Sequence, residues 1–309
     1  MGTLEVLDVG ADRAHDVLDL IHVTFAGRPV LDPPSTALEE TIDSVTRTLA
    51  RYGGLLALLD GRPVGALLLD EDQGLLGVHR VGVLAPARRH GVASALARRA
   101  EEVAGERKLR GLELEARREL PATVRFWEGH GYVETGHRGP RLRMTRLLPL
   151  TTDLPRAVDT RAVGERLGRL LRAGDLVILT GDLGAGKTTL TQGLGLGLGV
   201  RGAVTSPTFV ISRIHPAQHG GPPLVHVDAY RLGGTAELDD LDLDTDVEDA
   251  VTVVEWGEGL AEALTGDRLE IRLQRPADPS SEVRTLTMTA VGARWREADL
   301  SVVLLPDAD

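Results

Sequence analysis

Residues 181–188 read Gly-Asp-Leu-Gly-Ala-Gly-Lys-Thr, which fits the phosphate-loop pattern of glycine, four residues, glycine, lysine and a hydroxyl residue. The run Asp175–Thr180 before it is short, apolar and β-branched, as expected of a strand buried on both faces. The segment Thr189–Leu198 after it can form a helix. This order of strand, loop and helix directs free backbone N–H groups at one anionic site. The stretch therefore predicts a nucleotide-binding α/β fold.

The lysine of this loop is unusual for the chain. There are 33 arginines and two lysines, and Lys187 is the only lysine after residue 150. Basic positions are therefore arginine by default, except where a phosphate loop requires lysine. We expect Lys187 to reach the outer phosphates of a nucleotide, and the Thr188 hydroxyl to bind the accompanying magnesium.

Two later apolar runs each end in an acid. Residues 224–228 read LVHVD and residues 251–255 read VTVVE. A carboxylate at the C-terminal end of a parallel strand faces the ligand crevice of an α/β sheet. We expect Asp228 to bind magnesium directly or through water, and Glu255 to coordinate magnesium or orient the attacking water. The alternatives are an aspartate that caps the next element and a glutamate in a surface ion pair.

Length and composition favour two globular domains. The 309 residues suit two domains of about 150 residues each. No apolar run reaches the roughly 18 residues of a membrane span, the first residues lack a signal-peptide pattern, and cysteine is absent from the sequence. These features predict a cytoplasmic protein with no membrane partner. Residues 151–309 carry 15 basic and 25 acidic side chains. Because nucleic acid backbones are bound mainly through lysine and arginine, we expect this half to contact tRNA or other RNA only indirectly, through a partner protein.

The first half predicts one strand, two helices, three antiparallel strands, and then helices and strands in alternation. Asp60 and Gly61, between two apolar runs, are a strong hairpin signal. The expected strands are Leu4–Val9, Gly54–Leu59, Val64–Leu69, Leu75–Val83, Leu109–Glu115, Gly131–Thr135 and Leu142–Leu147. The expected helices are Ala11–Ala26, Ser35–Arg51, one that runs from the segment 88–93 to about Ala104, and Ala122–His130.

The second half begins after a predicted linker, Leu148–Arg156, which has two prolines and no periodicity. A helix is expected at Thr160–Leu171, and further strands at Val210–Ile214, Arg268–Leu273, Arg284–Val291 and Leu300–Leu305. The acid-rich run Asp239–Asp249 is expected to be a solvated loop. Ser206–Phe209 is interpreted as a nucleotide-sensing segment.

A second phosphate-binding pattern lies in the first half. Residues 88–93, RRHGVA, stand where a strand passes into a helix, which leaves backbone N–H groups free for a pyrophosphate. Together with the order of elements, VGVLAPARRHGVASAL and RFWEGHGYVETG resemble the GNAT family of acetyl-CoA-dependent N-acetyltransferases. The resemblance implies that Val81 and Val83 pair with the pantetheine arm of acetyl-CoA. It also implies that the pyrophosphate is cradled by Arg88, Gly91, Ala93 and Ser94.

The usual catalytic acid of that family is missing. Where these enzymes often carry a tyrosine that protonates the departing thiolate, this chain has Trp127, and Leu120 replaces a common asparagine. The candidates for a general base are His79, Glu113 and Glu115, each of which also fits a packing or solvated role. The acetyl acceptor is left unspecified. The alternative for this half is an acyl-CoA-binding module without catalysis.

The second half resembles the TsaE family, the ATPase subunit of the bacterial machinery that makes threonylcarbamoyladenosine in tRNA. The motifs are GDLGAGKTTLTQGLGLGLGV, SPTFV, HVDAYRL and VVEWGEGL, in this order. The resemblance implies ATP hydrolysis with Mg²⁺, and action with TsaD-like and TsaB-like proteins. It implies nucleotide contacts from Thr160, Leu183, Gly184, Ala185, Gly186, Lys187, Thr188, Thr189 and Trp256. The implied metal ligands are Thr188, Asp228 and Glu255, and the implied catalytic residues are Lys187, Asp228 and Glu255.

The sequence thus predicts an α/β protein with a GNAT-like mixed α/β domain at residues 1–148 and a P-loop NTPase-like α/β domain at residues 157–309. The expected cofactors are ATP, Mg²⁺ and acetyl-CoA. Two other functions remain open: a nucleotide-gated binding module and a small-molecule kinase.

Overall fold

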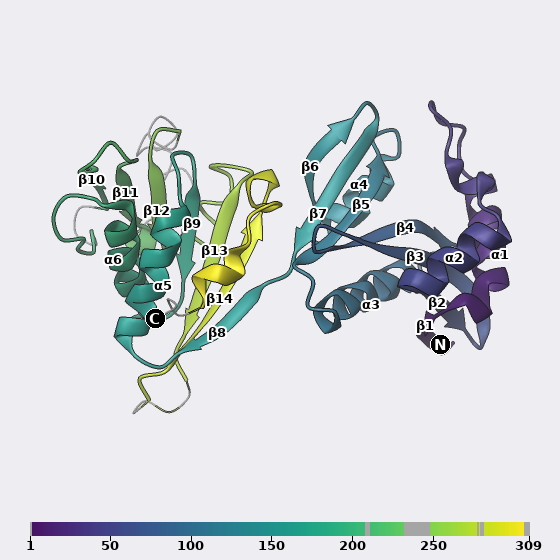
Figure 1. Ribbon diagram of the computed structural model, residues 1–309, viewed down its shortest axis with the longest axis horizontal. Coiled ribbons are helices and arrows are strands. Elements are labelled where there is room, and N and C mark those ends of the chain that lie inside the picture. Colours follow the sequence, from purple (N-terminus) through teal and green to yellow (C-terminus); the bar gives the residue numbers. More distant parts are fainter. Residues whose placement is uncertain (1, 208–210, 232–247, 277, 279–280, 306–309) are drawn as a thin grey trace. The chain divides into compact units, whose positions relative to one another are not determined.

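The computed structural model describes residues 2–207, 211–231, 248–276, 278 and 281–305 (Figure 1). The chain divides into two compact units, Met1–Leu148 and Pro149–Asp309. Each unit contains one seven-stranded sheet with helices, so the predicted mixed α/β class is confirmed. Within the described residues, no helix is long and apolar enough to cross a membrane.

The first unit is built on a sheet in the order β1-β2-β3-β4-β5-β7-β6. Its strands are β1 (Leu4–Val9), β2 (Gly54–Leu59), β3 (Arg62–Asp72), β4 (Leu75–Val83), β5 (Gly111–Arg117), β6 (Val133–Arg138) and β7 (Arg141–Leu147). Among the described residues of this unit, only β4 and β5 are parallel neighbours, and their pairing covers Leu75–Gly77 opposite Gly111–Glu113. The sheet therefore opens between these strands along the C-terminal half of β4.

Helices cover both faces of this sheet. They are α1 (Ala14–Ala26), α2 (Ile42–Tyr52), α3 (Val92–Glu106) and α4 (Pro121–Glu128). Successive residues of β3 point to opposite faces, as the period of a strand requires. Leu67 and Leu69 join the core that α3 covers, whereas Ala66 and Leu68 join the core of α1 and α2.

The predicted helix Ser35–Arg51 is divided in two. A short 3-10 turn, Thr36–Glu39, precedes α2, which begins only at Ile42. Thr41 starts the new helix because its hydroxyl accepts a hydrogen bond from the Ser44 N–H at 3.2 Å, while the Ser44 hydroxyl accepts one from the Thr41 N–H. This reciprocal capping fixes the boundary.

The second unit has a sheet in the order β10-β11-β12-β9-β13-β14-β8. Its strands are β8 (Leu150–Leu154), β9 (Leu176–Thr180), β10 (Ser212–His215), β11 (Leu224–Asp228), β12 (Val251–Glu255), β13 (Arg268–Gln274) and β14 (Arg284–Val291). The four strands from β11 to β13 in this order run parallel, and the outer ones pair antiparallel. The carboxyl ends of β9, β11 and β12 therefore meet at one edge of the sheet.

Two sequence expectations were wrong in this unit. The predicted linker Leu148–Arg156 contains β8, which pairs with β14 from Leu150 opposite Met288 to Leu154 opposite Arg284. Its prolines flank an edge strand, where a missing N–H does no harm. The predicted strand Leu300–Leu305 is instead a 3-10 turn at Leu300–Val303, begun by the Asp299 side chain, which accepts from the Ser301 N–H.

Some sequence expectations lie outside the described residues. These are the acid-rich run 239–249, except for its last two residues, and residues 208–210 of the predicted sensing segment and strand. The strand expected at Val210–Ile214 is found as β10, Ser212–His215.

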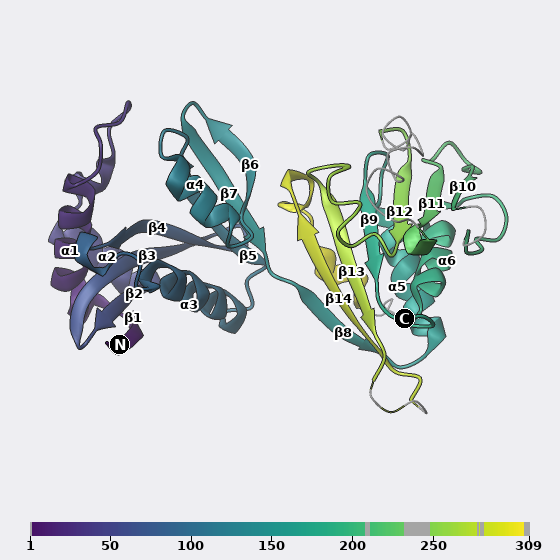
Figure 2. The same cartoon turned by 180° about the vertical axis from the view of Figure 1, so that it is seen from behind.

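Helices α5 (Ala157–Leu170) and α6 (Lys187–Leu198) pack through glycines on one face of the second sheet (Figure 2). A Cβ atom built at Gly193 would fall on the carbonyl oxygen of Arg161, and one at Gly197 on that of Glu165. Gly164 is equally close to the carbonyl oxygen of Leu190. The two backbones approach so closely that no larger side chain fits the seam, and this contact holds α6 in place behind the phosphate loop.

We expect Gly193→Ala to destabilise the second unit by about 1–3 kcal/mol, the usual cost of overpacking. The matched control is Gly105→Ala in α3, because a Cβ there meets no atom within 4 Å. That control should be neutral or stabilising, since alanine favours a helix over glycine by about 1 kcal/mol. Hydrogen exchange of peptides from each unit, measured against urea concentration, reports both effects. If the amides of α5 and α6 were as well protected from hydrogen exchange in Gly193→Ala as in the parent, the close packing of the two helices at Gly193 would be contradicted.

Candidate functional site

The phosphate loop, residues 181–186, joins β9 to α6. Gly181, Gly184 and Gly186 have φ values of +139°, +76° and +108°, which side chains rarely allow. Gly186 is the left-handed N-cap of α6. The N–H groups of the first turn of α6 have no partner within the helix and face the loop. The loop therefore has the concave, donor-rich backbone that an anion requires.

Lys187 lies inside this loop. Its Nζ donates to the carbonyl oxygens of Gly181 at 2.6 Å and Asp182 at 3.1 Å. It also lies 3.7 Å from the centroid of the Trp256 ring. Burial lowers the pKa of the Lys187 amine from its ordinary value, and three nearby carboxylates, those of Glu255, Asp228 and Asp182, act in the opposite direction. The ammonium is thus held beside the loop by weak acceptors that a phosphate can replace.

A buried chain of contacts connects the loop to two strands. The Thr188 hydroxyl donates to the Glu255 carboxylate, at 3.0 Å to Oε1 and 3.2 Å to Oε2. The His226 Nε2 lies 2.9 Å from Glu255 Oε1. Glu255 is only 3% exposed and His226 is fully buried, so the alternative of a surface ion pair for Glu255 is wrong. Sequence reasoning missed His226, although strand alternation places it on the same side of β11 as Asp228.

Asp228 stands opposite Glu255 in the parallel pairing of β11 and β12. Its carboxylate accepts from the Tyr230 N–H at 3.1 Å and from the Ser206 hydroxyl at 3.3 Å. The first contact is the capping role considered from the sequence. The second contact links Asp228 to the start of the segment interpreted as nucleotide-sensing. The two carboxylates are therefore neighbours at the edge where the loop lies.

The other residues predicted to contact the nucleotide differ in their burial and in their neighbours. Thr160 is buried in α5, and its methyl carbon lies 3.8 Å from the Cβ position of Gly186. Leu183 is 82% exposed, and Ala185 is fully buried. The Trp256 ring packs on Lys187, and its centroid lies 5.1 Å from that of the Tyr230 ring. Thr189 follows Thr188 in the first turn of α6.

Magnesium fits these residues only together with a phosphate. Within the described ranges, no cluster of three or more His, Cys, Asp or Glu side chains could hold a metal ion alone. Two carboxylates and the Thr188 hydroxyl are the oxygen ligands that Mg²⁺ prefers, and it usually completes its shell with water and phosphate oxygens.

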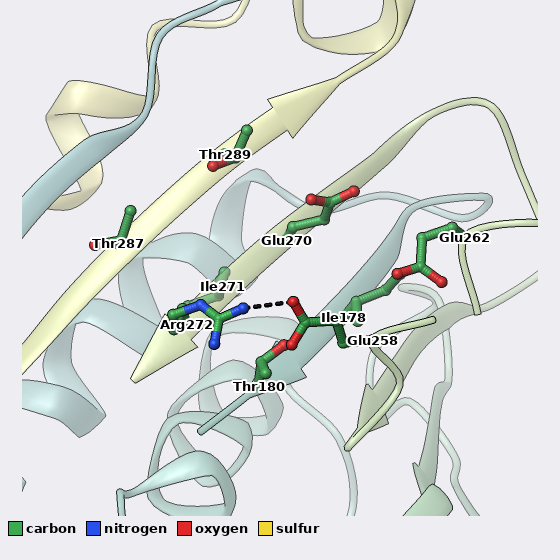
Figure 3. A pocket seen from close by; sticks show the side chains of 9 residues that line it. All are labelled: Ile178, Thr180, Glu258, Glu262, Glu270, Ile271, Arg272, Thr287 and Thr289. Atoms are coloured by element: carbon green, nitrogen blue, oxygen red, sulfur yellow. Dashed lines mark hydrogen bonds and ion pairs between the residues drawn. The ribbon is translucent and has the colours of Figure 1, made fainter. Parts of the chain in front are cut away.

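A cavity of about 190 Å³ lies over β9, β13 and β14 (Figure 3). Glu258, Glu262 and Glu270 line it, and Arg272 is ion-paired with Glu258. An acidic lining disfavours a triphosphate. The phosphate loop, and not this cavity, is therefore the candidate nucleotide site.

The first unit places its predicted acetyl-CoA residues where the sheet opens. Val81 and Val83 are on the part of β4 that β5 does not pair with, and the Val81 carbonyl oxygen accepts from Arg28 at 2.6 Å. Gly91 is the left-handed N-cap of α3, with φ +75°, and Ala93 lies in the first turn. Ser94 Oγ is 3.1 Å from His130 Nε2. Arg88 is exposed before the helix.

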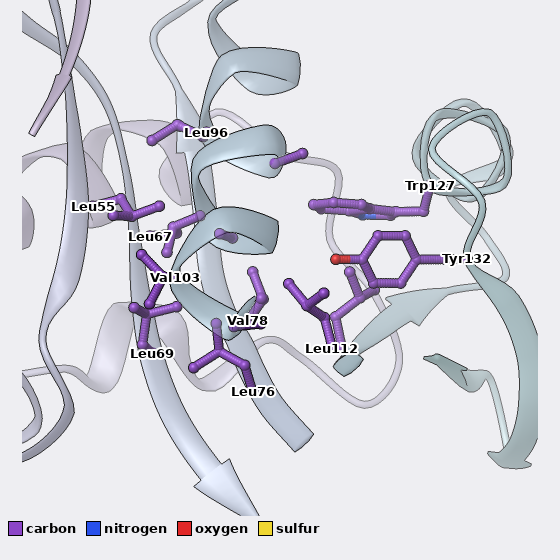
Figure 4. Close-up of a cluster of buried hydrophobic side chains, with 14 of the residues drawn as sticks. Leu55, Leu67, Leu69, Leu76, Val78, Leu96, Val103, Leu112, Trp127 and Tyr132 are labelled. Atoms are coloured by element: carbon purple, nitrogen blue, oxygen red, sulfur yellow. The ribbon is translucent and has the colours of Figure 1, made fainter. Parts of the chain in front are cut away.

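The residue at the missing acid position belongs to the core. Trp127 is 4% exposed and meets Tyr132 edge to face, with ring centroids 5.1 Å apart (Figure 4). The Tyr132 hydroxyl has no hydrogen-bond partner among the described residues, and burial raises its pKa. A buried phenol with a raised pKa gives up its proton less readily than an exposed one.

The three candidate bases all have partners. His79 Nε2 lies 2.7 Å from Asp70. Glu113 accepts from Thr145 at 3.1 Å, and Glu115 pairs with Arg141 at 3.3 Å. These contacts do not single out one of the three as a general base.

The loop, the parallel strands and the paired carboxylates define the second unit as a P-loop nucleotide-binding α/β domain, and the open sheet defines the first as a GNAT-like domain. The family model for the threonylcarbamoyl adenosine biosynthesis protein TsaE matches residues 154–283, and that for the acetyltransferase (GNAT) family matches residues 18–132. The chain belongs to the TsaE family through its C-terminal half, and the predicted GNAT resemblance of its N-terminal half is confirmed.

Individual proteins are similar to one half of the chain or the other. The tRNA threonylcarbamoyladenosine biosynthesis protein TsaE of Streptomyces coelicolor is 65% identical over 145 residues, which cover 46% of this chain and 98% of that protein. The TsaE of Bacillus subtilis is 41% identical over 138 residues, 44% of this chain and 83% of that protein. The crystal structure of PaiA N-acetyltransferase from Thermoplasma acidophilum with coenzyme A superimposes with a TM-score of 0.43 at 13% identity, covering 47% and 99% of the two chains.

Proposed function

We propose that residues 157–309 form an ATPase that serves the formation of threonylcarbamoyladenosine in tRNA, together with TsaD-like and TsaB-like proteins. The observation that carries the proposal is the Thr188 hydroxyl held by a buried Glu255 carboxylate beside Lys187, at the carboxyl ends of parallel strands. The relatives that share this half are named for the same tRNA modification. The acidic second half supports contact with tRNA through those partners only.

Each residue of the loop edge has a distinct task in this proposal. Lys187 exchanges its two carbonyl contacts for the outer phosphates of ATP. Thr188, Asp228 and Glu255 would hold magnesium, which, when bound, neutralises the charge of the β- and γ-phosphates. Glu255 also presents a carboxylate that can orient the attacking water. The arginines of this chain lie outside the phosphate loop itself, so a partner protein can complete the charge at the transition state.

Asp228→Ala is expected to raise the Mg²⁺ concentration for half-maximal ATP binding by about tenfold or more, because a carboxylate ligand is lost. Binding of ATP without magnesium should change little, since the loop and Lys187 are intact. Titration of Mg²⁺ against the parent and the variant, with bound nucleotide as the readout, measures both effects. An unchanged Mg²⁺ midpoint would show that Asp228 is not a magnesium ligand.

A small-molecule kinase would use the same loop. The ATPase proposal predicts inorganic phosphate as the product, whereas a kinase transfers the phosphoryl group to a second molecule. Mass spectrometry of a metabolite extract incubated with the protein and Mg-ATP separates the two, and a new phosphorylated metabolite would overturn the ATPase proposal.

For residues 1–148 we propose binding of acetyl-CoA across the open edge of β4 and the N-terminus of α3. The exposed segment 88–91 and the left-handed Gly91 support the site for the pyrophosphate. The buried Trp127 favours a binding module over an acetyltransferase of the tyrosine type. Calorimetry with acetyl-CoA tests binding, and release of CoA with amines and N-terminal peptides tests transfer. Binding without transfer to any acceptor supports the module, and transfer supports an N-acetyltransferase.

A further inference from the structure

We propose that His226 is a positioning residue that fixes the Glu255 carboxylate for its contacts with Thr188 and with magnesium. The inference rests on the proposed ATPase function of the same loop. It adds a residue that touches neither nucleotide nor metal but orients one that does.

The hydrogen-bond geometry makes the imidazole of His226 a donor to a single partner, the Glu255 carboxylate. His226 Nε2 lies 2.9 Å from Glu255 Oε1, and a carboxylate only accepts, so Nε2 carries the hydrogen. The other ring nitrogen, Nδ1, has no hydrogen-bond partner within the part of the chain that the structure describes. The polar contact of this ring is therefore directed at Glu255.

The strands explain why this contact is rigid. His226 lies on β11 and pairs with Val253 of β12, two residues before Glu255. Both strands are central, and every residue of both is buried. A fully buried ring on the close-packed face of a sheet cannot turn without disturbing its neighbours, so it holds Oε1 in one place.

The two oxygens of the Glu255 carboxylate have different sets of contacts. The Thr188 hydroxyl approaches both oxygens, at 3.0 and 3.2 Å, while His226 binds Oε1 alone. Without the imidazole, the carboxylate loses the donor that fixes its rotation about the last side-chain bond. Residues that orient a metal ligand in this way typically change metal affinity or activity by about 10–100-fold when they are removed.

The test uses His226→Leu, which keeps an apolar volume but no donor, and His226→Gln, which keeps a terminal N–H. The matched control is His215→Leu on β10, a second buried histidine whose ring centroid lies 6.4 Å from that of His226. The probe is the fluorescent nucleotide mant-ADP, titrated with Mg²⁺ in the full-length protein. Thermal unfolding identifies any variant that does not fold.

We expect His226→Leu to raise the Mg²⁺ midpoint by about tenfold, with mant-ADP affinity in the absence of magnesium changed less than about threefold. His226→Gln should recover most of the loss, and His215→Leu should match the parent. An unchanged midpoint in His226→Leu would overturn the inference, and so would equal shifts in His226→Leu and His215→Leu. If His226→Leu does not fold, His226→Gln serves as the test. A shift of its Mg²⁺ midpoint as large as that of Asp228→Ala would then overturn the inference.

A double-mutant cycle separates positioning from packing. In the Glu255→Ala background, His226→Leu should cause no further shift of the Mg²⁺ midpoint, because the side-chain oxygens on which it acts are gone. Additive shifts would mean that His226 acts independently of Glu255 and would overturn the inference. A parent protein that fails to bind mant-ADP at all would instead refute the ATPase proposal, on which the inference depends.

Discussion

Lys187→Ala is expected to weaken ATP binding by about ten- to a hundredfold, because hydrogen bonds to a charged group contribute about 1.5–3 kcal/mol and each 1.4 kcal/mol is about tenfold. Lys187 is the lysine that the loop encloses, and its Nζ lies within hydrogen-bond reach of the loop carbonyls. The centroid of the Trp256 ring lies 3.7 Å from Nζ, so we expect the tryptophan fluorescence of the parent to change on ATP addition, and this change should be lost in Lys187→Ala together with affinity.

Isothermal titration with ATP measures the change in affinity directly. The chain supplies a matched control in Lys108, its other lysine, which is exposed in the first unit. Lys108→Ala should bind ATP like the parent. Trp256→Phe controls for the fluorescence, since Trp127 and Trp295 contribute background. Parental ATP affinity in Lys187→Ala would show that the nucleotide does not occupy this loop.

Glu255→Gln should lower the rate of ATP hydrolysis by about a hundredfold or more, with ATP affinity changed less than about threefold. General-base groups contribute about 10²–10⁴-fold, and an interaction made mainly in the transition state changes turnover and not binding. The amide keeps the shape of the buried side chain, and its oxygen can still accept from Thr188 or His226. Loss of the negative charge is then the main change.

Phosphate release at saturating Mg-ATP tests this second expectation. Thermal unfolding of Glu255→Gln must resemble that of the parent, because His226 and Thr188 both donate to this buried group. Hydrolysis at the parental rate would remove Glu255 from catalysis. A large loss of affinity with unchanged turnover would make it a binding residue instead.

The sequence predicted those parts of the site that depend on local pattern. The strands at Leu224–Asp228 and Val251–Glu255 could be recognised because a strand that is buried along its whole length consists mostly of apolar, β-branched residues. The phosphate loop could be recognised because its glycines are required by backbone conformation. His226 was missed because a strand histidine has no specific meaning until the register of the neighbouring strand is known.

Tertiary contacts account for the remaining differences. Glycine is a poor helix former, yet residues 193–198 continue α6, because Gly193 and Gly197 let it approach α5. The proline-flanked segment Leu150–Leu154 became an edge strand only because β14 offers it a partner. The local sequence of α6 does not show that α5 will pack against it, and the local sequence of β8 does not show that β14 will pair with it.

The most direct test of the account measures threonylcarbamoyladenosine in tRNA. Bacterial cells depleted of their own TsaE are supplied with the full-length chain or with its Lys187→Ala variant, and the tRNA nucleosides are quantified by mass spectrometry. The account predicts that the parent chain restores the modified nucleoside and that Lys187→Ala does not, at equal protein levels. Restoration by Lys187→Ala to the level of the parent would contradict a role for ATP bound at this loop.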